Sequence, residues 1–357
     1  MGVKWGVVGC GQIADIEMIP AIKEAKNSQL VSIMSRSKEK AKKFSSKHNI
    51  PQYFTTIEEF LKDSSLDAVY IATPPHLHCQ QTIKAAEYGK HVFCEKPMSI
   101  TVQECEKMIE ACNKAGVKLM IGCNLRFHSI HVKTKEIIET GLLGKIILIK
   151  IQGSFYYPPD PDSWRLRPEM VGGGSLTDMG IHCVDLLRFF MGEVVQVSAF
   201  VDNVVFDYPV EDTALVSVKF ANGAYGFIES CYSAYYTENR FEVIGSKGTL
   251  FGEKSIWGDP TPGILRAFAG KVGRTHDVKF APPWGQDSSL GGLGTIIKEY
   301  NLLPCNTFTA QVEHFSECIM HNREPEINGI EGLRDLQVVK AAYKSAKEGK
   351  TVKITSY

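Results

Sequence analysis

The sequence predicts an α/β protein with two domains: an N-terminal doubly wound parallel sheet and a C-terminal α+β domain with an open, mostly antiparallel sheet. Three observations lead to this prediction. The 357 residues are too many for one ordinary hydrophobic core. Short apolar runs alternate with helical patterns through residues 1–124, which is typical of parallel β-α-β units. Beyond that point the apolar runs lengthen and helical patterns become rare.

The N-terminal domain is assigned to residues 1–124. Its strands are expected where the apolar runs are short, near residues 3–9, 29–35, 67–73, 90–94 and 118–122. Its helices are expected at Ala14–Ala25, Lys38–His48, Ile57–Leu61, His76–Tyr88 and Thr101–Ala115. Gly89 and Gly116 follow the last two helices, as capping glycines do. Strands and helices in this order predict a parallel sheet.

The C-terminal domain is assigned to residues 125–357. Strands rich in β-branched and aromatic residues are expected at Lys145–Phe155, Val194–Asp202, Ala214–Phe220, Ala224–Ser230 and Arg240–Ile244. One long helix, Thr177–Phe190, is expected among them. The stretch from Lys254 to Pro304 is rich in glycine and proline and is expected to form loops with one short helix. Residues 331–357 should close the domain with a helix at Leu333–Ala346 and a strand at Thr351–Ile354.

Composition and charge exclude several classes of protein. Hydrophobic residues make up 44% and charged residues 22%, a normal balance for a soluble globular chain. Basic and acidic residues number 40 each, so no overall field attracts nucleic acid or an anionic membrane. The chain begins with a strand pattern instead of a signal peptide, and no apolar run reaches the roughly 18 residues that cross a bilayer. We expect a cytoplasmic protein without nucleic-acid or membrane partners.

The ten cysteines show neither a metal-binding nor a disulfide pattern. They are scattered without a C-x-x-C pair. Most lie in apolar stretches, where a free cysteine behaves as a small hydrophobic residue. We therefore expect structural thiols, a reducing compartment and no bound metal.

The segment Gly9-Cys10-Gly11-Gln12-Ile13-Ala14 follows a predicted strand and opens a predicted helix. In this context G-x-G-x-x-A is a dinucleotide-binding pattern. Gly9 allows the tight turn, Gly11 lets the backbone approach a pyrophosphate, and Ala14 lets the helix pack on the strand. The helix N-terminus adds amides and partial positive charge. The alternative is a glycine-rich turn without a ligand. We expect Gly9, Gly11, Gln12 and Ile13 to bind a nicotinamide cofactor.

The end of the second strand distinguishes the two nicotinamide cofactors. NAD is typically held by an acidic residue about twenty positions after the glycines, but Met34-Ser35-Arg36-Ser37-Lys38 contains none. Ser35 and Ser37 can donate hydrogen bonds to a 2′-phosphate, and Arg36 can stack on adenine while meeting the phosphate. The alternative for Arg36 is a solvated loop residue. The pattern favours NADP, with NAD possible.

Two further strand ends carry polar groups. The first is Ala72-Thr73-Pro74-Pro75-His76-Leu77-His78, and the second is Cys94-Glu95-Lys96-Pro97. Open α/β sheets bind ligands at the carboxyl ends of their strands. Lys96, between a carboxylate and a proline, is therefore a candidate for chemistry as well as for cofactor binding. The cofactor-binding candidates here are Thr73, Pro74, His78, Glu95 and Lys96.

Asp178 and His182 lie four residues apart on a predicted helix, after Gly172-Gly173-Gly174-Ser175-Leu176. Side chains at this spacing share one helix face. A carboxylate beside an imidazole can orient it for proton transfer near pH 7. Asp185, three residues after His182, either supports it or faces solvent. The alternative is a histidine that is satisfied by hydrogen bonds and plays no part in chemistry. We take Asp178 and His182 as catalytic and substrate-binding candidates.

These motifs together resemble the glucose-fructose oxidoreductase / inositol dehydrogenase / rhizopine-catabolism family of NAD(P)-dependent oxidoreductases. The resemblance covers nearly the whole chain. It is carried by G-x-G-x-x-A at 9–14, Glu95-Lys96-Pro97, Gly173-Gly174 with Asp178-x-Gly180-x-His182, and the segment Val339–Ala346. It implies an N-terminal Rossmann domain and a C-terminal domain whose open sheet commonly forms dimers or tetramers.

The resemblance also implies roles for single residues. Lys96 matches the active-site lysine, which contacts the reacting oxygen and the nicotinamide ribose. Its ammonium would stabilise negative charge that develops on that oxygen. His182 matches the proton-transferring residue, and Asp178 matches the carboxylate beside it. Hydride passes directly between substrate and nicotinamide, so the chemistry needs no metal.

One segment narrows the subgroup. Pro159–Leu166 contains Trp164-Arg165-Leu166, which looks like the W-R-L segment of members that act on free sugars with NADP. These members include aldose 1-dehydrogenases, glucose-fructose oxidoreductase and 1,5-anhydrofructose reductase. Their tryptophan and arginine lie near nicotinamide and substrate, so Trp164 and Arg165 are candidates for binding both. A core tryptophan with an ion-paired arginine is the alternative. The same subgroup tends to carry Ser-Arg where this chain has Ser35-Arg36, which again favours NADP.

Further candidates come from the domain junction and from aromatic residues. Asn124, Arg126 and Phe127 match a family segment that faces the cofactor cleft. We assign Asn124 to the cofactor and Arg126 to the substrate. Tyr156 and Tyr236 are candidates to line a sugar pocket, because aromatic rings pack on pyranose faces, although aromatic residues on strands are more often core residues.

The leading hypothesis is an NADP-dependent oxidoreductase that acts on a sugar, polyol or keto-sugar as a homodimer or homotetramer. One alternative is a regulatory protein that senses NAD(P), but such relatives usually lack the lysine or histidine that this chain has. A second is a glycosidase that uses bound NAD, but the missing acid after the second strand argues against it. The direction of the reaction and the identity of the sugar stay open.

Overall fold

Six parallel strands form the N-terminal sheet. The computed structural model describes residues 2–160, 162–256, 261–269 and 296–354. The strands follow the order β3-β2-β1-β4-β5-β6, and every neighbouring pair is parallel. Their bounds are β1 (Val3–Val8), β2 (Ser28–Met34), β3 (Gln52–Phe54), β4 (Ala68–Ile71), β5 (His91–Cys94) and β6 (Leu119–Ile121). The predicted doubly wound sheet is confirmed, and the three-residue strand β3 was not predicted.

Helices connect these strands and cover both faces of the sheet. They are η1 (Ala14–Met18) with α1 (Ile19–Glu24), α2 (Lys38–Lys47), α3 (Ile57–Leu61), η2 (Pro75–Leu77) with α4 (His78–Glu87), and α5 (Val102–Ala115). Three of the helices begin at side-chain caps: the hydroxyl oxygens of Ser37, Thr56 and Thr101 accept hydrogen bonds from backbone N–H groups in the first turn of α2, α3 and α5. Gly116 ends α5 with a φ of 67°, a left-handed conformation that suits glycine.

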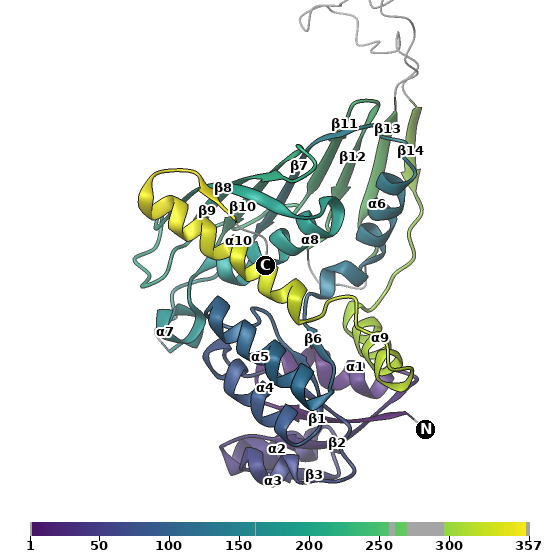
Figure 1. Ribbon diagram of the computed structural model, residues 1–357, viewed down its shortest axis with the longest axis vertical. Helices are drawn as coiled ribbons and strands as arrows, with labels where there is room; N and C mark the ends of the chain where they lie inside the picture. The colour runs from purple at the N-terminus through teal and green to yellow at the C-terminus, as the bar shows by residue number, and fades with distance from the viewer. Residues whose placement is uncertain (1, 161, 257–260, 270–295, 355–357) are drawn as a thin grey trace, which may run out of the picture.

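One face of the parallel sheet is covered by a helix from the far end of the chain. Trp5 of β1 and Phe93 of β5 pack against Phe315 of α9 (Thr307–Met320), with ring centroids 5.7 and 5.9 Å apart. Figure 1 shows α9 beside α1, next to strands that are far away in sequence. The N-terminal core is therefore completed by residues after position 300.

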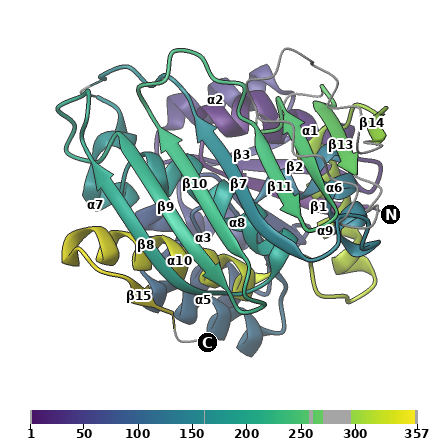
Figure 2. The ribbon, with the colours of Figure 1, turned by 90° about the horizontal axis from the view of Figure 1, so that it is seen from above.

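The second sheet has nine strands in the order β14-β13-β12-β11-β7-β10-β9-β8-β15. Only the pair β7 and β10 is parallel; the other neighbours are antiparallel, as predicted. The sheet is seen face-on in Figure 2. Its strands are β7 (Ile146–Ser154), β8 (Val194–Asp202), β9 (Thr213–Phe220), β10 (Tyr225–Cys231), β11 (Phe241–Gly245), β12 (Gly248–Glu253), β13 (Ile264–Ala269), β14 (Ile296–Tyr300) and β15 (Val352–Lys353).

The expectation of loops with one short helix between Lys254 and Pro304 is wrong where the structure describes this stretch. β13 and β14 pair with each other, and β13 pairs with β12. Leu265 and Ala267 of β13 point into the core. Pairing with β12 and this burial give the segment a strand conformation that its own composition did not indicate. Residues 257–260 and 270–295 lie outside the described residues.

Helices cover one face of the second sheet. They are η3 (Asn124–Phe127), α6 (Ser129–Glu139), η4 (Trp164–Leu166), α7 (Pro168–Val171), η5 (Leu176–Gly180), α8 (Ile181–Met191) and α10 (Gly329–Glu348). The sheet side chains that face α8 and α10 form the largest core, with Ile149, Val216 and Val243 fully buried. On the other face Phe200 is 79% exposed and Tyr225 54% exposed. The expected homodimer or homotetramer stays a prediction.

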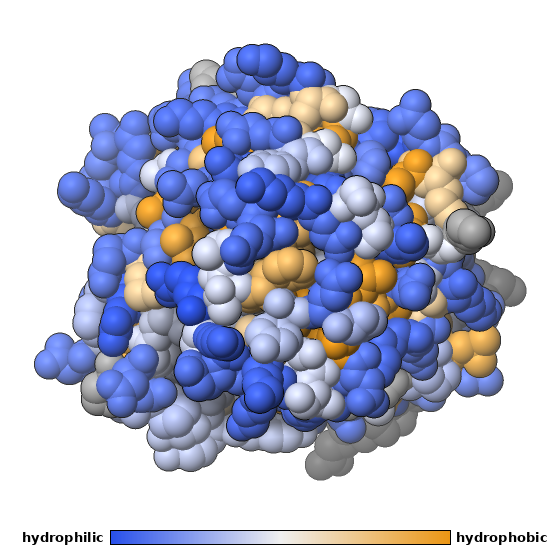
Figure 3. Space-filling view, turned by 90° about the horizontal axis from the view of Figure 1, so that it is seen from below, coloured by the Kyte–Doolittle hydropathy of each residue, from blue (hydrophilic) through white to orange (hydrophobic). Residues whose placement is uncertain are grey.

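The end of the molecule that the parallel sheet forms is mostly hydrophilic, with small hydrophobic patches between the charged side chains (Figure 3). Within the described ranges, no helix combines the length and the apolar composition that a membrane span requires.

Candidate active site

A groove runs along the carboxyl ends of the parallel strands. Its volume is about 730 Å³. It brings together most of the predicted cofactor residues: Gly9, Gly11, Gln12, Ile13, Ser35, Arg36, Thr73, Pro74, Trp164 and Arg165. Helical turns begin at residue 12 and continue without a break to residue 24, so their free N–H groups open onto this groove.

The two glycines of the loop differ in what a side chain at each position would meet. Gly9 has a φ of 111°, and a Cβ there would lie 2.8 Å from the carbonyl oxygen of Ala72. A Cβ on Gly11 would meet nothing nearer than that same oxygen at 3.8 Å. Gly11 therefore leaves its side of the groove open, which fits a group as bulky as a dinucleotide phosphate.

The far end of the groove is basic. Ser35 and Arg36 follow β2 and line it together with Lys40 of α2. Lys40 was not predicted; its position one turn after the cap Ser37 was the available signal. Glu39, the nearby carboxylate, accepts a hydrogen bond from the Ser37 hydroxyl at 2.9 Å and is not among the lining residues. The described groove residues between β2 and β3 therefore include two cations and no carboxylate, whereas α3 contributes the carboxylate Glu58.

A second cavity of about 210 Å³ adjoins the groove. The two share Ile13, Ala72, Thr73, Trp164 and Arg165, so they form one continuous site. The second cavity collects the predicted catalytic residues Lys96, Asp178 and His182, from the end of β5, from η5 and from α8, together with the predicted cofactor residues Glu95 and Asn124. Sequence elements that lie more than 80 residues apart meet here.

Lys96 is held by Asp178. The Lys96 Nζ donates to the carbonyl oxygen and to Oδ1 of Asp178, at 2.8 Å each. Both side chains are mostly buried, at 15% and 22% exposure. The charges of Lys96 and Arg165 hold the pKa of Asp178 well below its usual value, although burial opposes this. Two of the three N–H groups of the ammonium are thus used.

Tyr232 completes this arrangement and was missed by the sequence analysis. It directly follows β10, lines the cavity and donates a hydrogen bond to Asp178 Oδ2 at 3.0 Å. In the sequence Tyr232 is recognisable only as a residue at the end of a predicted strand. Its place near the cavity follows from the parallel pairing of β10 with β7, which the sequence does not reveal.

His182 lies on the first turn of α8 and lines the same cavity. Burial, aided by the positive charge of Lys96, lowers its pKa well below the usual value. Its ring is therefore neutral near pH 7. Its Nδ1 is enclosed and has no hydrogen-bond partner among the described residues.

The idea that Asp178 and Asp185 orient His182 is not supported by the geometry. The Asp178 carboxylate bonds to Lys96 and Tyr232 instead of the imidazole. The reason is that both partners reach it from other elements, whereas helix spacing alone considers one element. Asp185 neither supports His182 nor faces solvent, because it is buried and paired with Arg126.

Glu95 is a buried carboxyl group at the edge of the cavity. It accepts hydrogen bonds from the Tyr70 hydroxyl and from the backbone N–H of Lys96, the latter at 3.2 Å. Burial raises its pKa from the usual value. Its side chain lies against Gly122, where a Cβ would be 3.0 Å from Glu95 Oε1. These contacts fix the strand end from which Lys96 projects.

Trp164 and Arg165 lie on the short η4 turn and line both cavities. The guanidinium carbon of Arg165 is 4.6 Å from the centre of the Trp164 ring, a cation–π distance. Its Nε is 3.9 Å from Asp178 Oδ2. The predicted pair therefore lies at the junction of the groove and the second cavity.

Asn124 lines the second cavity, and its Nδ2 donates to Thr307 Oγ1 at 3.0 Å; its contact with the cofactor stays a prediction. His78, in contrast, lines neither cavity and is fully buried. Its two ring nitrogens lie 3.0 and 2.7 Å from the carbonyl oxygens of Pro97 and Thr73. The imidazole is thus occupied in joining two strand-end loops, so the prediction of direct cofactor contact does not hold for His78.

The two tyrosines proposed for a sugar pocket also lie elsewhere. Tyr156 stacks on Tyr235 with ring centroids 4.1 Å apart. Tyr236 is 78% exposed, and its hydroxyl donates to Glu238. Neither lines a described cavity wall next to Lys96. Tyr156 lies beyond the end of β7, Tyr236 lies in the segment after β10, and the tyrosine that lines the cavity is Tyr232.

Arg126 belongs to a buried ionic network instead of the substrate cavity. Its Nε donates to Asp185 Oδ1 at 2.8 Å, and its guanidinium also pairs with Glu331 at 2.9 Å. Arg188 pairs with Asp335 at 2.6 Å. The prediction that Arg126 binds substrate is corrected accordingly, because η3 directs it toward α8 and α10.

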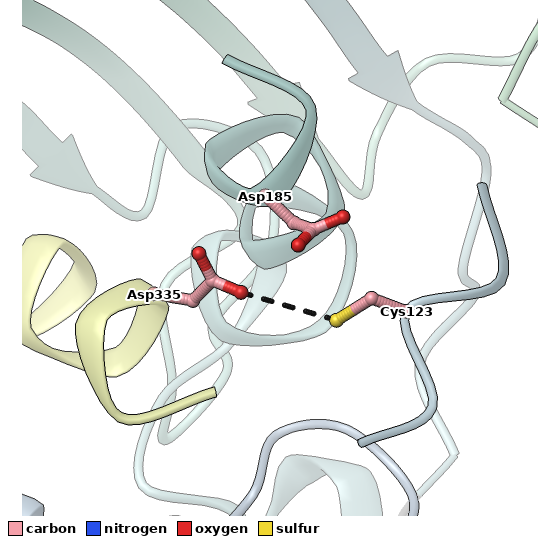
Figure 4. A group of neighbouring side chains, drawn as sticks. All are labelled: Cys123, Asp185 and Asp335. Atoms are coloured by element: carbon pink, nitrogen blue, oxygen red, sulfur yellow. Dashed lines mark hydrogen bonds between the residues drawn. The ribbon is translucent and has the colours of Figure 1, made fainter. Parts of the chain in front are cut away.

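The centre of this network groups Cys123, Asp185 and Asp335 (Figure 4). The Cys123 thiol donates to Asp335 Oδ2 at 3.9 Å. The spacing would suit a metal ion, but Arg126 and Arg188 already neutralise the two carboxylates. Burial, with the negative charge of Asp185, raises the pKa of Asp335 to about 8. Asp335 therefore binds a proton more tightly in the folded protein than in the unfolded chain.

This proton makes stability depend on pH. Between about pH 4 and pH 8 the folded protein keeps a proton on Asp335 that the unfolded chain has released. The free energy of unfolding therefore falls as pH rises through this range. Asp335→Asn cannot ionise, so its urea midpoint should fall less between pH 5 and pH 9 than that of the wild type. The exposed Asp202→Asn is the control. Parallel pH curves for wild type and Asp335→Asn would contradict the assignment.

Two regions of the chain match known families. Residues 3–123 match the oxidoreductase family with an NAD-binding Rossmann fold, and residues 131–251 match the GFO/IDH/MocA C-terminal domain. The 1,5-anhydro-D-fructose reductase of Ensifer adhaerens is 29% identical over 356 residues, 98% of either chain. The myo-inositol 2-dehydrogenase of Thermotoga maritima is 30% identical over 358 residues, 99% of this chain and 98% of the dehydrogenase.

A solved structure agrees with these matches. The aldose-aldose oxidoreductase of Caulobacter crescentus, complexed with glycerol, is 33% identical and superposes with a TM-score of 0.86. The match covers 99% of this chain and 100% of the other. The resemblance noted in the sequence is thus confirmed, and with it the enzyme class. This chain belongs to the GFO/IDH/MocA family of NAD(P)-dependent oxidoreductases.

Proposed function

We propose that the protein is an NADP(H)-dependent oxidoreductase that transfers a hydride between nicotinamide and a sugar, polyol or keto-sugar carbon. The observation that carries the proposal is the environment of Lys96. Its ammonium lines a cavity that opens into a groove behind the glycine loop, and Asp178 occupies only two of its three N–H groups.

Lys96 provides the charge for the reaction. Its remaining N–H is available to the substrate oxygen, and the ammonium stabilises that oxygen as negative charge develops on it. Asp178 keeps the ammonium in place from both its backbone and its side chain. A preorganised donor of this kind costs no rearrangement when the reaction occurs.

His182 carries the proton. Its neutral imidazole can take the hydroxyl proton in oxidation and give it back in reduction. Because Nδ1 is enclosed, Nε2 is the nitrogen that meets the substrate. A bound nicotinamide supplies or accepts the hydride.

The lining of the second cavity supports a polyhydroxylated substrate. Asn124, Thr177 and Arg165 offer hydrogen-bonding groups, while Trp164 and Phe308 offer flat apolar surface. The related proteins described above act, by name, on a fructose derivative, an inositol and aldoses. A sugar or polyol is the substrate class on which both observations agree.

The preference for NADP rests on the basic end of the groove. Arg36 and Lys40 can pair with a 2′-phosphate, and Ser35 can donate a hydrogen bond to it. None of the described groove residues between β2 and β3, where NAD enzymes hold the ribose, is a carboxylate; Glu58, which also lines the groove, lies on α3 and pairs with Lys84.

Arg36→Ala tests this preference. Loss of a charge-assisted contact to phosphate should weaken NADPH binding by about 10- to 100-fold, while NADH binding stays nearly the same. Both dissociation constants follow from the fluorescence of the reduced nicotinamide. Lys38→Ala, an exposed neighbour outside the groove, should change neither constant. An equal loss for both cofactors would contradict a role at the 2′-phosphate.

The function itself is tested by absorbance at 340 nm. Purified protein is mixed with NADP or NADPH and a panel of aldoses, ketoses, anhydro-sugars and inositols. We expect turnover with at least one of these substrates, and a higher kcat/KM with NADP(H) than with NAD(H). Absence of turnover with the whole panel in both directions would overturn the proposal.

A further inference from the structure

Tyr232 is enclosed by ring contacts and backbone hydrogen bonds. Its ring is 1% exposed and packs against Phe155 and Tyr157, with centroids 5.2 and 5.3 Å away. Its backbone N–H donates to the Asp212 carbonyl at 2.7 Å, and its own carbonyl accepts from the N–H of Tyr157 at 2.8 Å. A ring confined in this way keeps its hydroxyl at a fixed point in the cavity wall.

That hydroxyl occupies one of the two oxygens of the Asp178 carboxylate. Tyr232 donates to Oδ2, while Lys96 donates to Oδ1. The other charged or titratable groups that face Asp178 are Arg165 of η4 and His182 of α8. His182 lies one turn further along the same helical segment, and its Nδ1 has no partner. If Asp178 Oδ2 lost its bond to Tyr232, the polar groups left to it would be Arg165 Nε, 3.9 Å away, and the unpartnered Nδ1 of His182.

We propose that Tyr232 is a positioning residue that holds the Asp178 carboxylate on Lys96 and away from His182. The inference rests on the function proposed above. A carboxylate bonded to the imidazole would favour its cationic form, which cannot accept a substrate proton. A carboxylate kept on Lys96 leaves His182 neutral and fixes the ammonium. Tyr232 thereby helps Lys96 to stay a charged hydrogen-bond donor and His182 to stay a neutral proton acceptor.

Tyr232→Phe tests the inference because it keeps the ring and removes the hydroxyl. Asp178 is then free to turn toward His182 Nδ1, and the pKa of His182 should rise by about one unit. NMR titration of the full-length protein with labelled histidine rings measures this pKa. The His182 signal is identified by its loss in His182→Gln.

Two further variants make the result specific. Tyr208→Phe removes a buried hydroxyl from the same aromatic cluster, where it donates to the Tyr157 carbonyl, and should leave the His182 pKa unchanged. Combining Tyr232→Phe with Asp178→Asn should abolish the rise, because the effect requires the carboxylate. A rise that persists in the double variant, or one that Tyr208→Phe reproduces, would overturn the positioning role.

The NMR readout does not depend on turnover. An unchanged His182 pKa in Tyr232→Phe refutes the inference even if the enzyme is active. A shifted pKa in a protein that turns over none of the substrates supports the positioning role and refutes the proposed function. Where turnover is found, the acidic limb of the kcat–pH profile of Tyr232→Phe should move upward by the same amount as the NMR value.

Discussion

Replacement of Lys96 by methionine is expected to lower kcat by about 10²–10³-fold while NADPH binding stays nearly unchanged. Methionine keeps the length of the side chain and removes the charge that stabilises the reacting oxygen. The glycine loop, Ser35 and Arg36, which line the groove, are untouched. The measurements are kcat from absorbance at 340 nm with saturating substrate, and the dissociation constant of NADPH from its fluorescence.

Lys90→Met is the matched control for this variant. Lys90 immediately precedes β5 and Lys96 follows it, but Lys90 donates to the carbonyl oxygens of Asp63 and Leu66, far from the cavity. Its replacement should lower stability without lowering kcat of the folded protein. A loss below tenfold in Lys96→Met, or an equal loss in Lys90→Met, would show that the ammonium at position 96 is not the group that stabilises the oxygen.

Arg126→Met is expected to destabilise the protein by about 3–5 kcal/mol. The variant leaves the carboxylate of Asp185, whose side chain is 1% exposed, without its cation. Neighbouring Asp335 cannot compensate, because it is itself an acid. The loss is measured as a lower urea midpoint at pH 7. Since Arg126 lies outside the substrate cavity, KM for the substrate should stay nearly the same.

A double variant separates lost charge compensation from lost packing. Arg126→Met with Asp185→Leu removes both ions, and buried ion pairs replaced by apolar residues often lose little stability. The double variant should therefore be more stable than Arg126→Met alone. If the single variant instead kept full stability and raised KM strongly, the direct substrate role first assigned to Arg126 would be restored.

The parts of the fold that local sequence determines were predicted well. The strand-helix alternation before residue 124 reflects strands such as β4, which is buried on both faces and reads as an unbroken apolar run. The errors fall where partners far away in the chain decide the structure. α6 and α9 were missed, and β13 was read as a loop although its neighbour β12 makes it a strand.

The predictions of site residues were likewise correct where topology alone places a residue, and wrong where distant partners decide the direction of its side chain. Lys96, Asp178 and His182 meet in one cavity because they lie at strand and helix ends whose location follows from topology. Side-chain direction does not follow from topology. His78 and Arg126 have polar side chains at suitable places, yet they turn toward carbonyl groups and carboxylates that sequence spacing does not reveal.

The packing of α9 on the parallel sheet has a consequence for how the protein is made. Trp5 and Phe93 gain their contact with Phe315 only when that residue has been translated and its helix has docked. While the ribosome is still adding the second domain, the nascent N-terminal sheet carries a bare aromatic face. The cofactor domain therefore reaches its final packing only after most of the polypeptide has been synthesised.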